Sequence, residues 1–319
     1  MGTQGSVRAS GGAIAGAVAP PVTAGMRAER RRESRAAYLF IFPTFLLFVL
    51  FVGGPLLASI GLSFTHYDVF NPPRWAGLSN YQQLAADKQA IVSFRNTGVF
   101  VVFSVAIELV LALLLALGIQ QKMPTFLRYF FRTAYFLPII TSSAAIGIVF
   151  GFMFNKDFGV INYYLGLLGF DRVPWVTSTR YSLWTIILAA SWQRLGFTFI
   201  LFSAGLQNIP RELYEAADLD GATGWSRLTR ITLPLLSPTI LFTAVIGIIG
   251  SLQIFDLPKI ITNGGPGDSS RTVVMIIQEA GFGNLQFGYG SAIAVVLFLL
   301  IMALTLTQFW LSRRLVHYR

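Results

Sequence analysis

The segment "ELYEAADLDGATGWSRLTRITLPLLSP" (residues 212–238) is a polar, helix-forming stretch between two long runs of apolar residues. Across the 319 residues of the chain, 54% are hydrophobic and 12% are charged, whereas an ordinary soluble domain carries about 25% charged residues. This composition excludes a soluble globular protein. We therefore interpret residues 212–238 as a polar connection between two membrane-spanning helices.

Six apolar stretches are long enough to cross a bilayer, whose core of about 30 Å needs about 20 helical residues. They cover residues 38–63, 97–119, 130–154, 182–206, 238–262 and 290–312. A helix satisfies its own backbone hydrogen bonds in lipid. The sequence thus predicts an all-α membrane protein with six transmembrane helices and a polar loop, about residues 207–237, between the fourth and the fifth.

The first apolar stretch follows residues 1–26, which are rich in Gly, Ala, Ser and Pro, and a basic run over residues 27–35. The stretch is too long for the core of a signal peptide and lacks a small-residue cleavage pattern, so we interpret it as a retained anchor. We expect a disordered basic segment over residues 1–35 and a transmembrane domain over residues 36–319.

Lysine and arginine residues predict the orientation, because the cytoplasmic loops of membrane proteins are enriched in them. Fifteen lie near the termini, in residues 122–132 or in the polar loop, and seven lie in the connections on the other side. We therefore place both termini and the polar loop in the cytoplasm. The net charge of +10 follows from this topology, and the dispersed basic residues disfavour nucleic-acid binding.

The sequence lacks the residue patterns that several common kinds of enzyme site require. The chain has no cysteine, and its two histidines, His66 and His317, fall on opposite sides of the predicted membrane. No lysine follows a glycine, so the sequence has no P-loop for phosphate binding. We expect no catalytic residue, metal or cofactor in this chain, and no ATP site of its own.

The polar loop begins with a short predicted helix. Residues 211–220 are good helix formers after Pro210, and Gly221 stands where a left-handed cap would end the helix. Such a helix is too short to be stable alone in water. It has an acidic side and a stripe of small apolar residues, namely Glu212, Glu215 and Asp218, and Leu213, Ala216 and Ala217.

A second short helix, over residues 225–231, carries Arg227 and Arg230 and is expected to stop at Pro234. The two helices could lie on the lipid headgroups. This alternative is disfavoured, because an anionic leaflet repels the acidic first helix. A helix with small residues and an acidic edge is better suited to a groove on another protein.

The loop resembles a known family motif. Glu215-Ala216-Ala217, three further residues, Gly221, and then Ile231, Leu233-Pro234 and Pro238 are similar to the E-A-A-x-x-x-G loop and trailing I-x-L-P of the permease subunits of ATP-binding-cassette (ABC) importers. In that family the loop is a cytoplasmic coupling helix that docks in a cleft of a separate ATPase subunit. The resemblance implies that ATP and Mg²⁺ bind to the ATPase. It implies a coupling role for Leu213, Glu215, Ala216, Ala217, Asp220, Gly221, Arg227 and Pro234.

Two further stretches, "SWQRLGFTFILFSAGLQNIP" (residues 191–210) and "LQIFDLPKIITNGGPGDSSRTVVMIIQEAGF" (residues 252–282), resemble the carbohydrate-uptake branch of these permeases. They are most similar to the first permease subunit of maltose-like oligosaccharide and glycerol-3-phosphate importers. This resemblance implies a non-enzymatic transport subunit in a bacterial plasma membrane. The implied partners are a second homologous permease, two ATPase subunits and an extracytoplasmic substrate-binding (lipo)protein.

The implied solute is a disaccharide or oligosaccharide, with glycerol-3-phosphate or a glycerophosphodiester as the alternative. A secondary carrier or channel that works without ATP is less favoured. Such carriers often contain inverted repeats with paired broken helices, and the sequence has no convincing internal repeat.

Polar residues inside apolar stretches are costly and often mark solute paths. Asp256 and Lys259 lie three residues apart beside Pro258, and they either neutralise each other or line such a path. The candidates for the path are Asp256, Gln253, Phe255, Trp192, Gln193 and Lys259. We expect Arg194 to form a structural salt bridge with Glu108.

The remaining features are expected on the extracytoplasmic side. The glycines and proline of "TNGGPGDSS" (residues 262–270) predict a flexible turn. The loops over residues 65–96 and 155–181 carry candidates for contact with the binding protein, which are Trp75, Tyr81, Trp175 and Tyr181.

Overall fold

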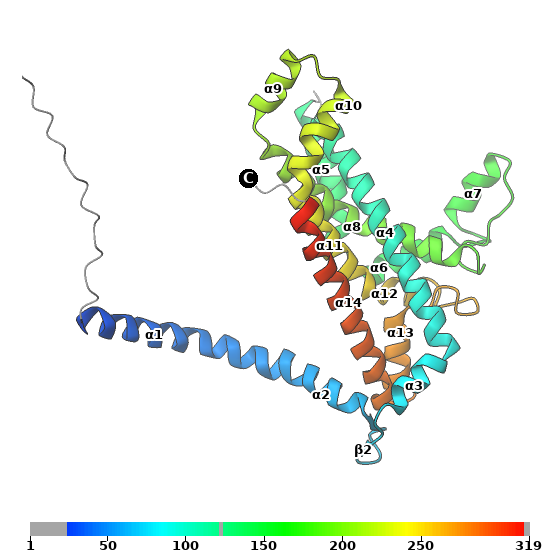
Figure 1. Cartoon of the computed structure of the whole chain (residues 1–319). Coiled ribbons are helices and arrows are strands. Elements are labelled where there is room, and N and C mark those ends of the chain that lie inside the picture. Colours follow the sequence, from blue (N-terminus) through cyan, green and yellow to red (C-terminus); the bar gives the residue numbers. More distant parts are fainter. Residues whose placement is uncertain (1–23, 121–123, 316–319) are drawn as a thin grey trace, which may run out of the picture. The chain divides into compact units, whose positions relative to one another are not determined.

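The computed structural model describes residues 24–120 and 124–315 (Figure 1). The chain divides into two compact units, Met1–Leu57 and Ala58–Arg319. α1 (Ala24–Phe48) leads through a π-helical turn, η1 (Val49–Gly53), into α2 (Gly54–Ser63), within which the boundary between the two units falls.

The predicted disorder over residues 1–35 is wrong for residues 24–35, which are helical. Ala, Arg, Glu and Met are strong helix formers, and no proline interrupts them here. Residues 1–23 lie outside the described part of the chain.

Five helices of the described chain are long and apolar enough to cross a membrane. They are Ala37–Ser63, Lys88–Ile119, Ser182–Gln207, Gly224–Leu252 and Phe287–Arg313. The first, second, fourth and sixth predicted spans each fall within one of these helices. The third and the fifth differ from the prediction.

The third predicted span, residues 130–154, is a bent pair of helices. α5 (Thr125–Ile140) and α6 (Ser143–Met153) are separated by Thr141 and Ser142, and the axis turns by 107° there. The Ser142 hydroxyl accepts a hydrogen bond from the Ala144 N–H at 3.3 Å. This N-terminal cap lets a new helix begin in a different direction.

The fifth predicted span, residues 238–262, is shifted toward the N-terminus. α10 (Gly224–Arg227), the π-helical turn η2 (Leu228–Thr232) and α11 (Leu233–Leu252) follow one another without a break. Pro234 therefore does not stop the helix; it follows η2 directly. α11 ends at Leu252, and Asp256 and Lys259 lie on a separate short helix, α12 (Asp256–Ile261).

Both Pro55 and Pro234 follow a π-helical turn by two residues. In a regular α-helix, the proline ring clashes with the carbonyl group four residues earlier. A π-helical turn contains an extra residue and widens the backbone. The π-helical turns thus accommodate these prolines within apolar helices.

The buried apolar side chains of the second unit form three clusters, and α4 (Lys88–Gln120) contributes to all of them. One cluster joins α4 to α13 (Val273–Gln278) and α14 (Phe287–Leu315). The second joins it to α6, α8 (Ser182–Gln207) and α12, and the third to α8 and α11. Figure 1 shows α4, α8, α11 and α14 as the long helices of this unit.

Short elements lie at both ends of these helices (Figure 1). At one end are α9 (Arg211–Leu219) and α10. At the opposite end, an antiparallel pair of two-residue strands, β1 (Thr65–His66) and β2 (Arg74–Trp75), precedes α3 (Ser79–Ala86). α7 (Val160–Leu167) follows α6, and the π-helical turn η3 (Glu279–Gly283) follows α13. The strand pair is a small departure from the all-α prediction.

Gly205 sets the distance between α8 and α11. A Cβ atom at this position would lie 2.7 Å from Leu236 Cδ1 and 2.8 Å from Thr239 Oγ1, which is closer than real Cβ atoms approach other atoms. Small residues commonly permit such close helix crossings in membrane proteins.

Gly205→Ala is expected to lower the melting temperature of the detergent-solubilised chain. The added methyl group must push α8 and α11 apart, at a cost of about 1–3 kcal/mol. Gly98→Ala is the matched control, because Gly98 also lies in a long helix but has nothing within 4 Å of its would-be Cβ. Equal melting temperatures for both variants and the wild type would contradict the close crossing.

Candidate functional site

α9 has the boundaries that the sequence predicts. It begins after Pro210 and is closed by Gly221, whose φ of +69° lies in the left-handed region. The Ala222 N–H donates to the Ala217 carbonyl at 2.9 Å, as expected for a glycine-capped helix end. The predicted short helix and its cap are confirmed.

Two contacts fasten α9 to the helix that follows it. Arg227 and Asp218 form an ion pair at 2.6 Å, and the Tyr214 and Thr232 hydroxyl groups are 3.1 Å apart. Both charged side chains are partly exposed to solvent, so the ion pair contributes only about 0–1 kcal/mol. We call residues 211–232, held together in this way, the polar hairpin.

The polar hairpin does not present the alanine surface that the sequence suggests. Ala217 is only 8% exposed, and Leu213 packs against the cluster that joins α4, α8 and α11. Ala216 and Glu215 are exposed. The helical spacing places Leu213 and Ala217 one turn apart on the face that meets the bundle, which leaves the neighbouring face open.

Two large apolar side chains on the polar hairpin are open to solvent. Leu219 is 91% exposed and Trp225 is 74% exposed. Sequence reasoning missed Leu219, although a leucine beside the acidic residues of so polar a helix was a usable signal. Exposed apolar groups beside charged ones are typical of a protein-binding surface.

A cavity of about 360 Å³ lies among α4, α5, α8, α11 and the starts of α6 and α12. We call it the central cavity. Its lining residues are Glu108, Ile139, Ser143, Gln193, Arg194, Phe197, Thr243, Ile246, Gly247, Gly250, Gln253, Ile254, Phe255, Asp256 and Leu257. The break between α11 and α12 places three residues of the predicted path here, which are Gln253, Phe255 and Asp256.

Four of the six predicted path residues, Gln193, Gln253, Phe255 and Asp256, line the central cavity. Trp192 and Lys259 do not. The Trp192 ring packs against Phe150 of α6 at 5.5 Å, because adjacent residues of α8 point in different directions.

The expected salt bridge between Arg194 and Glu108 is wrong, since the described side chains form no such ion pair. Arg194 Nη1 instead donates to Ser251 Oγ at 2.5 Å and to the Gly247 carbonyl at 3.4 Å. Glu108 Oε1 accepts from the Thr198 hydroxyl at 2.5 Å. α11 thus supplies the partners of Arg194, and α8 supplies the partner of Glu108.

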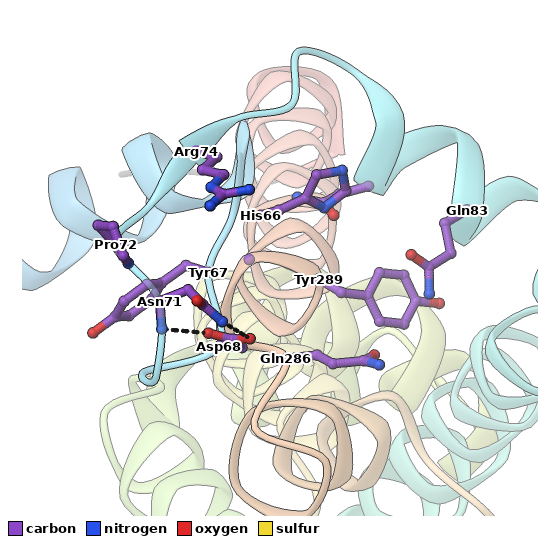
Figure 2. A pocket seen from close by; sticks show the side chains of 11 residues that line it. His66, Tyr67, Asp68, Asn71, Pro72, Arg74, Gln83, Gln286 and Tyr289 are labelled. Carbon is purple, nitrogen blue, oxygen red and sulfur yellow. Dashed lines mark hydrogen bonds between the residues drawn. The ribbon is translucent and has the colours of Figure 1, made fainter.

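A second cavity of about 360 Å³ lies beside the strand pair. Figure 2 shows side chains from the β1–β2 connection, α3 and the start of α14 around it. Asn71 donates to both Asp68 oxygens at 2.9 Å, and its side-chain hydrogen bond is the main reason that the pKa of Asp68 is lowered. Sequence reasoning missed this cavity, because its walls come together only through the turn at β1 and β2.

The aromatic residues proposed for a partner contact have different environments. Trp75 is exposed and stacks on Phe64 at 5.8 Å. Trp175 instead packs edge-on against Phe154, and its Nε1–H donates to Asn162 at 3.2 Å. These contacts of Trp175 stabilise the α6–α7 region.

Residues 262–270 form a hydrogen-bonded loop instead of the flexible turn that was predicted. The Thr262 and Ser270 hydroxyl groups lie 2.7 Å apart and close the loop. Asn96 of α4 donates to the Asp268 carbonyl at 2.7 Å, and the Ser182 and Ser269 hydroxyl groups are 2.8 Å apart. Contacts to α4 and α8, which are distant in sequence, hold the loop.

Comparisons with known proteins agree with this architecture. The family described as "Binding-protein-dependent transport system inner membrane component" matches residues 108–317. The "Probable ABC transporter permease protein YesP" of Bacillus subtilis (strain 168) is 36% identical, over 90% of this chain and 94% of that protein. The "Arabinooligosaccharides transport system permease protein AraP" of Halalkalibacterium halodurans is 34% identical, over 86% of this chain and 87% of that protein.

A solved structure has the same fold. It is the crystal structure of a bacterial ABC transporter involved in the import of the acidic polysaccharide alginate. One of its chains matches this chain with a TM-score of 0.80 and 26% sequence identity, and the match covers 91% of this chain and 99% of that chain. The chain described here belongs to the binding-protein-dependent transport system inner membrane component family. It is a multi-pass membrane protein of the ABC transporter permease class, as the polar loop indicated.

Single-cysteine labelling tests whether water reaches the central cavity, because the natural chain has no cysteine. Gln253→Cys is expected to react with a small charged methanethiosulfonate reagent at least about tenfold faster than Leu252→Cys. Gln253 is exposed at the cavity, whereas its neighbour Leu252 is buried in the core. Equal labelling rates would mean that the cavity is closed to water.

Proposed function

We propose that this chain is one of two permease subunits of an ABC importer and that it helps to carry a sugar across the membrane. The observation that carries this proposal is the polar hairpin. Glu215, Ala216, Leu219 and Trp225 are exposed on it, whereas Leu213 packs against the bundle and Ala217 is buried. Such an outward-facing helical surface is suited to bind a groove on another protein.

The proposed topology has six spans, with the bent pair α5–α6 as the third. Lysine and arginine predominate on the side of the termini and the polar hairpin, which favours a cytoplasmic position for both. The transmembrane domain then runs from about residue 36 to the C-terminus, and the bacterial plasma membrane is its proposed location. The cavity beside the strand pair lies on the extracytoplasmic side in this topology.

In the proposed coupling, an ATPase subunit binds the exposed face of α9. Glu215 and Ala216 make the contact, and Leu219 and Trp225 add apolar area. Leu213, which packs against the cluster that joins α4, α8 and α11, transmits the movement to these helices, and Ala217 is a further buried position on α9. Asp220 and Gly221 end the helix, Arg227 braces it through Asp218, and Pro234 begins α11.

The energy source in this proposal is a separate chain. Two ATPase subunits bind ATP and Mg²⁺, a second homologous permease completes the path, and an extracytoplasmic binding protein delivers the solute. The proposed solute is a disaccharide or oligosaccharide, and the name of the relative AraP supports this class. Glycerol-3-phosphate or a glycerophosphodiester is the alternative.

The central cavity is the proposed part of the solute path in this subunit. Gln193, Gln253 and Asp256 offer hydrogen-bonding groups there, and Phe255 offers an apolar face. Ligand sites commonly combine apolar walls with a few polar groups. Trp192 and Lys259, which do not line the cavity, are left out of the proposed path.

Glu215→Arg and Ala216→Trp are expected to reduce ATP-dependent uptake to background while the chain still inserts into the membrane, because both change the exposed face of α9. Asp171→Arg, a charge reversal at an exposed site between α7 and α8, is the matched control and should transport normally. Ala217→Trp should instead reduce the amount of folded chain, since Ala217 is buried. Normal uptake by both test variants would contradict docking at α9.

The whole assembly provides the direct test of function. Purification of the tagged chain from cells that express its partners should retain an ATPase chain at equal copy number. Vesicles that contain this assembly and the binding protein should accumulate labelled sugar only when ATP is present on the ATPase side. Uptake by the chain alone without ATP would identify a secondary carrier instead.

A further inference from the structure

The cavity beside the strand pair contains two opposite charges that do not neutralise each other. Arg74 of β2 and Asp68 of the β1–β2 connection both line this cavity of about 360 Å³ (Figure 2). The ion pairs within residues 24–120 and 124–315 include neither side chain. A free guanidinium and a free carboxylate in one cavity offer separate partners to a ligand that carries both kinds of charge.

Both charges are accessible to a ligand. Arg74 is exposed and Asp68 is partly exposed. The backbone and side-chain N–H groups of Asn71 donate to the two Asp68 oxygens, each at 2.9 Å, and these hydrogen bonds lower the pKa of Asp68. Asp68 is therefore ionised at neutral pH. Each carboxylate oxygen has two acceptor positions, so one position on each remains free for a further donor.

The length of α14 places the cavity at the level of the lipid headgroups. Tyr289, in the first turn of α14, lines the cavity, and Arg313 lies near the other end of the helix. The two residues are about 36 Å apart along the axis, at a rise of about 1.5 Å per residue. The hydrocarbon core of a bilayer is about 30 Å thick, and about 40–45 Å with its headgroups. With Arg313 at one membrane surface, Tyr289 lies in the headgroup layer of the other.

An aromatic surface leads from the cavity to an exposed apolar side chain. The Tyr67 ring, which lines the cavity, lies 6.0 Å from the Phe287 ring, and the Phe287 ring lies 5.6 Å from that of Phe282. Phe282 is 71% exposed. Exposed apolar side chains beside polar groups are typical of membrane or ligand contacts. The arrangement suits a ligand with a charged head and an apolar tail.

We propose that this cavity binds the headgroup of phosphatidylethanolamine, a zwitterionic phospholipid, with its phosphate on Arg74 and its primary ammonium group on Asp68. Arginine commonly binds phosphate through two parallel N–H donors, and an ammonium group donates well to a carboxylate. The amides of Gln83 and Gln286, which also line the cavity, can donate to the remaining phosphate and ester oxygens. The inference goes beyond transport and requires only that the chain spans a membrane.

The two charges also predict which lipids the cavity rejects. An anionic headgroup such as that of phosphatidylglycerol has no cation for Asp68 and brings a like charge toward it. The ammonium group of phosphatidylcholine carries three methyl groups and has no N–H to donate to the carboxylate. Phosphatidylethanolamine satisfies both Arg74 and Asp68, and its headgroup would join the β1–β2 connection to the start of α14.

The test measures dissociation constants for the full chain in detergent by native mass spectrometry. The probes are phosphatidylethanolamine, phosphatidylcholine and phosphatidylglycerol with identical acyl chains, and the soluble headgroup sn-glycero-3-phosphoethanolamine. The wild type is expected to bind one phosphatidylethanolamine at least about tenfold more tightly than the other two lipids, because each of them loses a hydrogen bond between charged groups. The soluble headgroup should bind at least about tenfold more weakly than the lipid, since it has no apolar tail to contact Phe282.

Two variants separate the contributions of the charges. Asp68→Asn should bind phosphatidylglycerol as tightly as phosphatidylethanolamine, because the carboxylate that discriminates between them is gone. Arg74→Gln should weaken the binding of all three lipids by about tenfold, the loss expected for a hydrogen bond to a charged group. Asp171→Asn and Arg172→Gln make the same two changes at exposed sites between α7 and α8. These matched controls should keep the wild-type affinities.

An unchanged lipid preference in Asp68→Asn, or an unchanged affinity in Arg74→Gln, would overturn the proposed site. Equal affinities for the lipid and the soluble headgroup would identify a site for a soluble phosphodiester and would overturn the assignment to a lipid. The melting temperatures of the lipid-free variants should equal that of the wild type. If Arg74→Gln alone melts earlier, the lipid preference of Asp68→Asn decides. ATP-dependent uptake is measured separately, so the importer and the lipid site can fail independently.

Discussion

A membrane interior offers no hydrogen bonds, so every buried polar group must find its partner within the protein. This constraint explains why the apolar stretches are helices, and it also explains their irregularities. π-helical turns accommodate Pro55 and Pro234, and Ser142 caps the helix that begins at the bend between α5 and α6. Arg194 finds its partners on α11.

The polar hairpin and the central cavity share the same pair of helices. α8 leads directly into the polar hairpin and α11 leads out of it, and the same two helices line the central cavity. They cross closely at Gly205, near the hairpin. The Arg194–Ser251 hydrogen bond joins them again at the cavity. A displacement of the hairpin therefore reaches the cavity through packed helices, which is a physical route for coupling between two sites.

Two breaks between helices lie beside the central cavity and bring polar side chains to its wall. The end of α11 and the start of α12 bring Gln253 and Asp256 to the cavity, and the turn between α5 and α6 brings Ser143, which accepts from Gln193 at 3.0 Å. A straight helix would turn these groups in different directions. Broken helices at solute sites are a general feature of transporters, because unwound segments are tolerated in membranes only where they face protein or a water-filled cavity.

The sequence by itself determined which stretches are apolar helices, where α9 begins and ends, and that a family motif occupies the polar loop. These properties depend on local composition, helix periodicity and a single glycine in the left-handed region, so they can be predicted without tertiary contacts. Only the tertiary structure decided the bend of the third span, the burial of Ala217, the ordered loop at residues 262–270 and the partners of Arg194 and Glu108. Each of these depends on how helices distant in sequence cross one another. A crossing is set by the fit of side chains from both helices, and no single stretch of sequence contains that information.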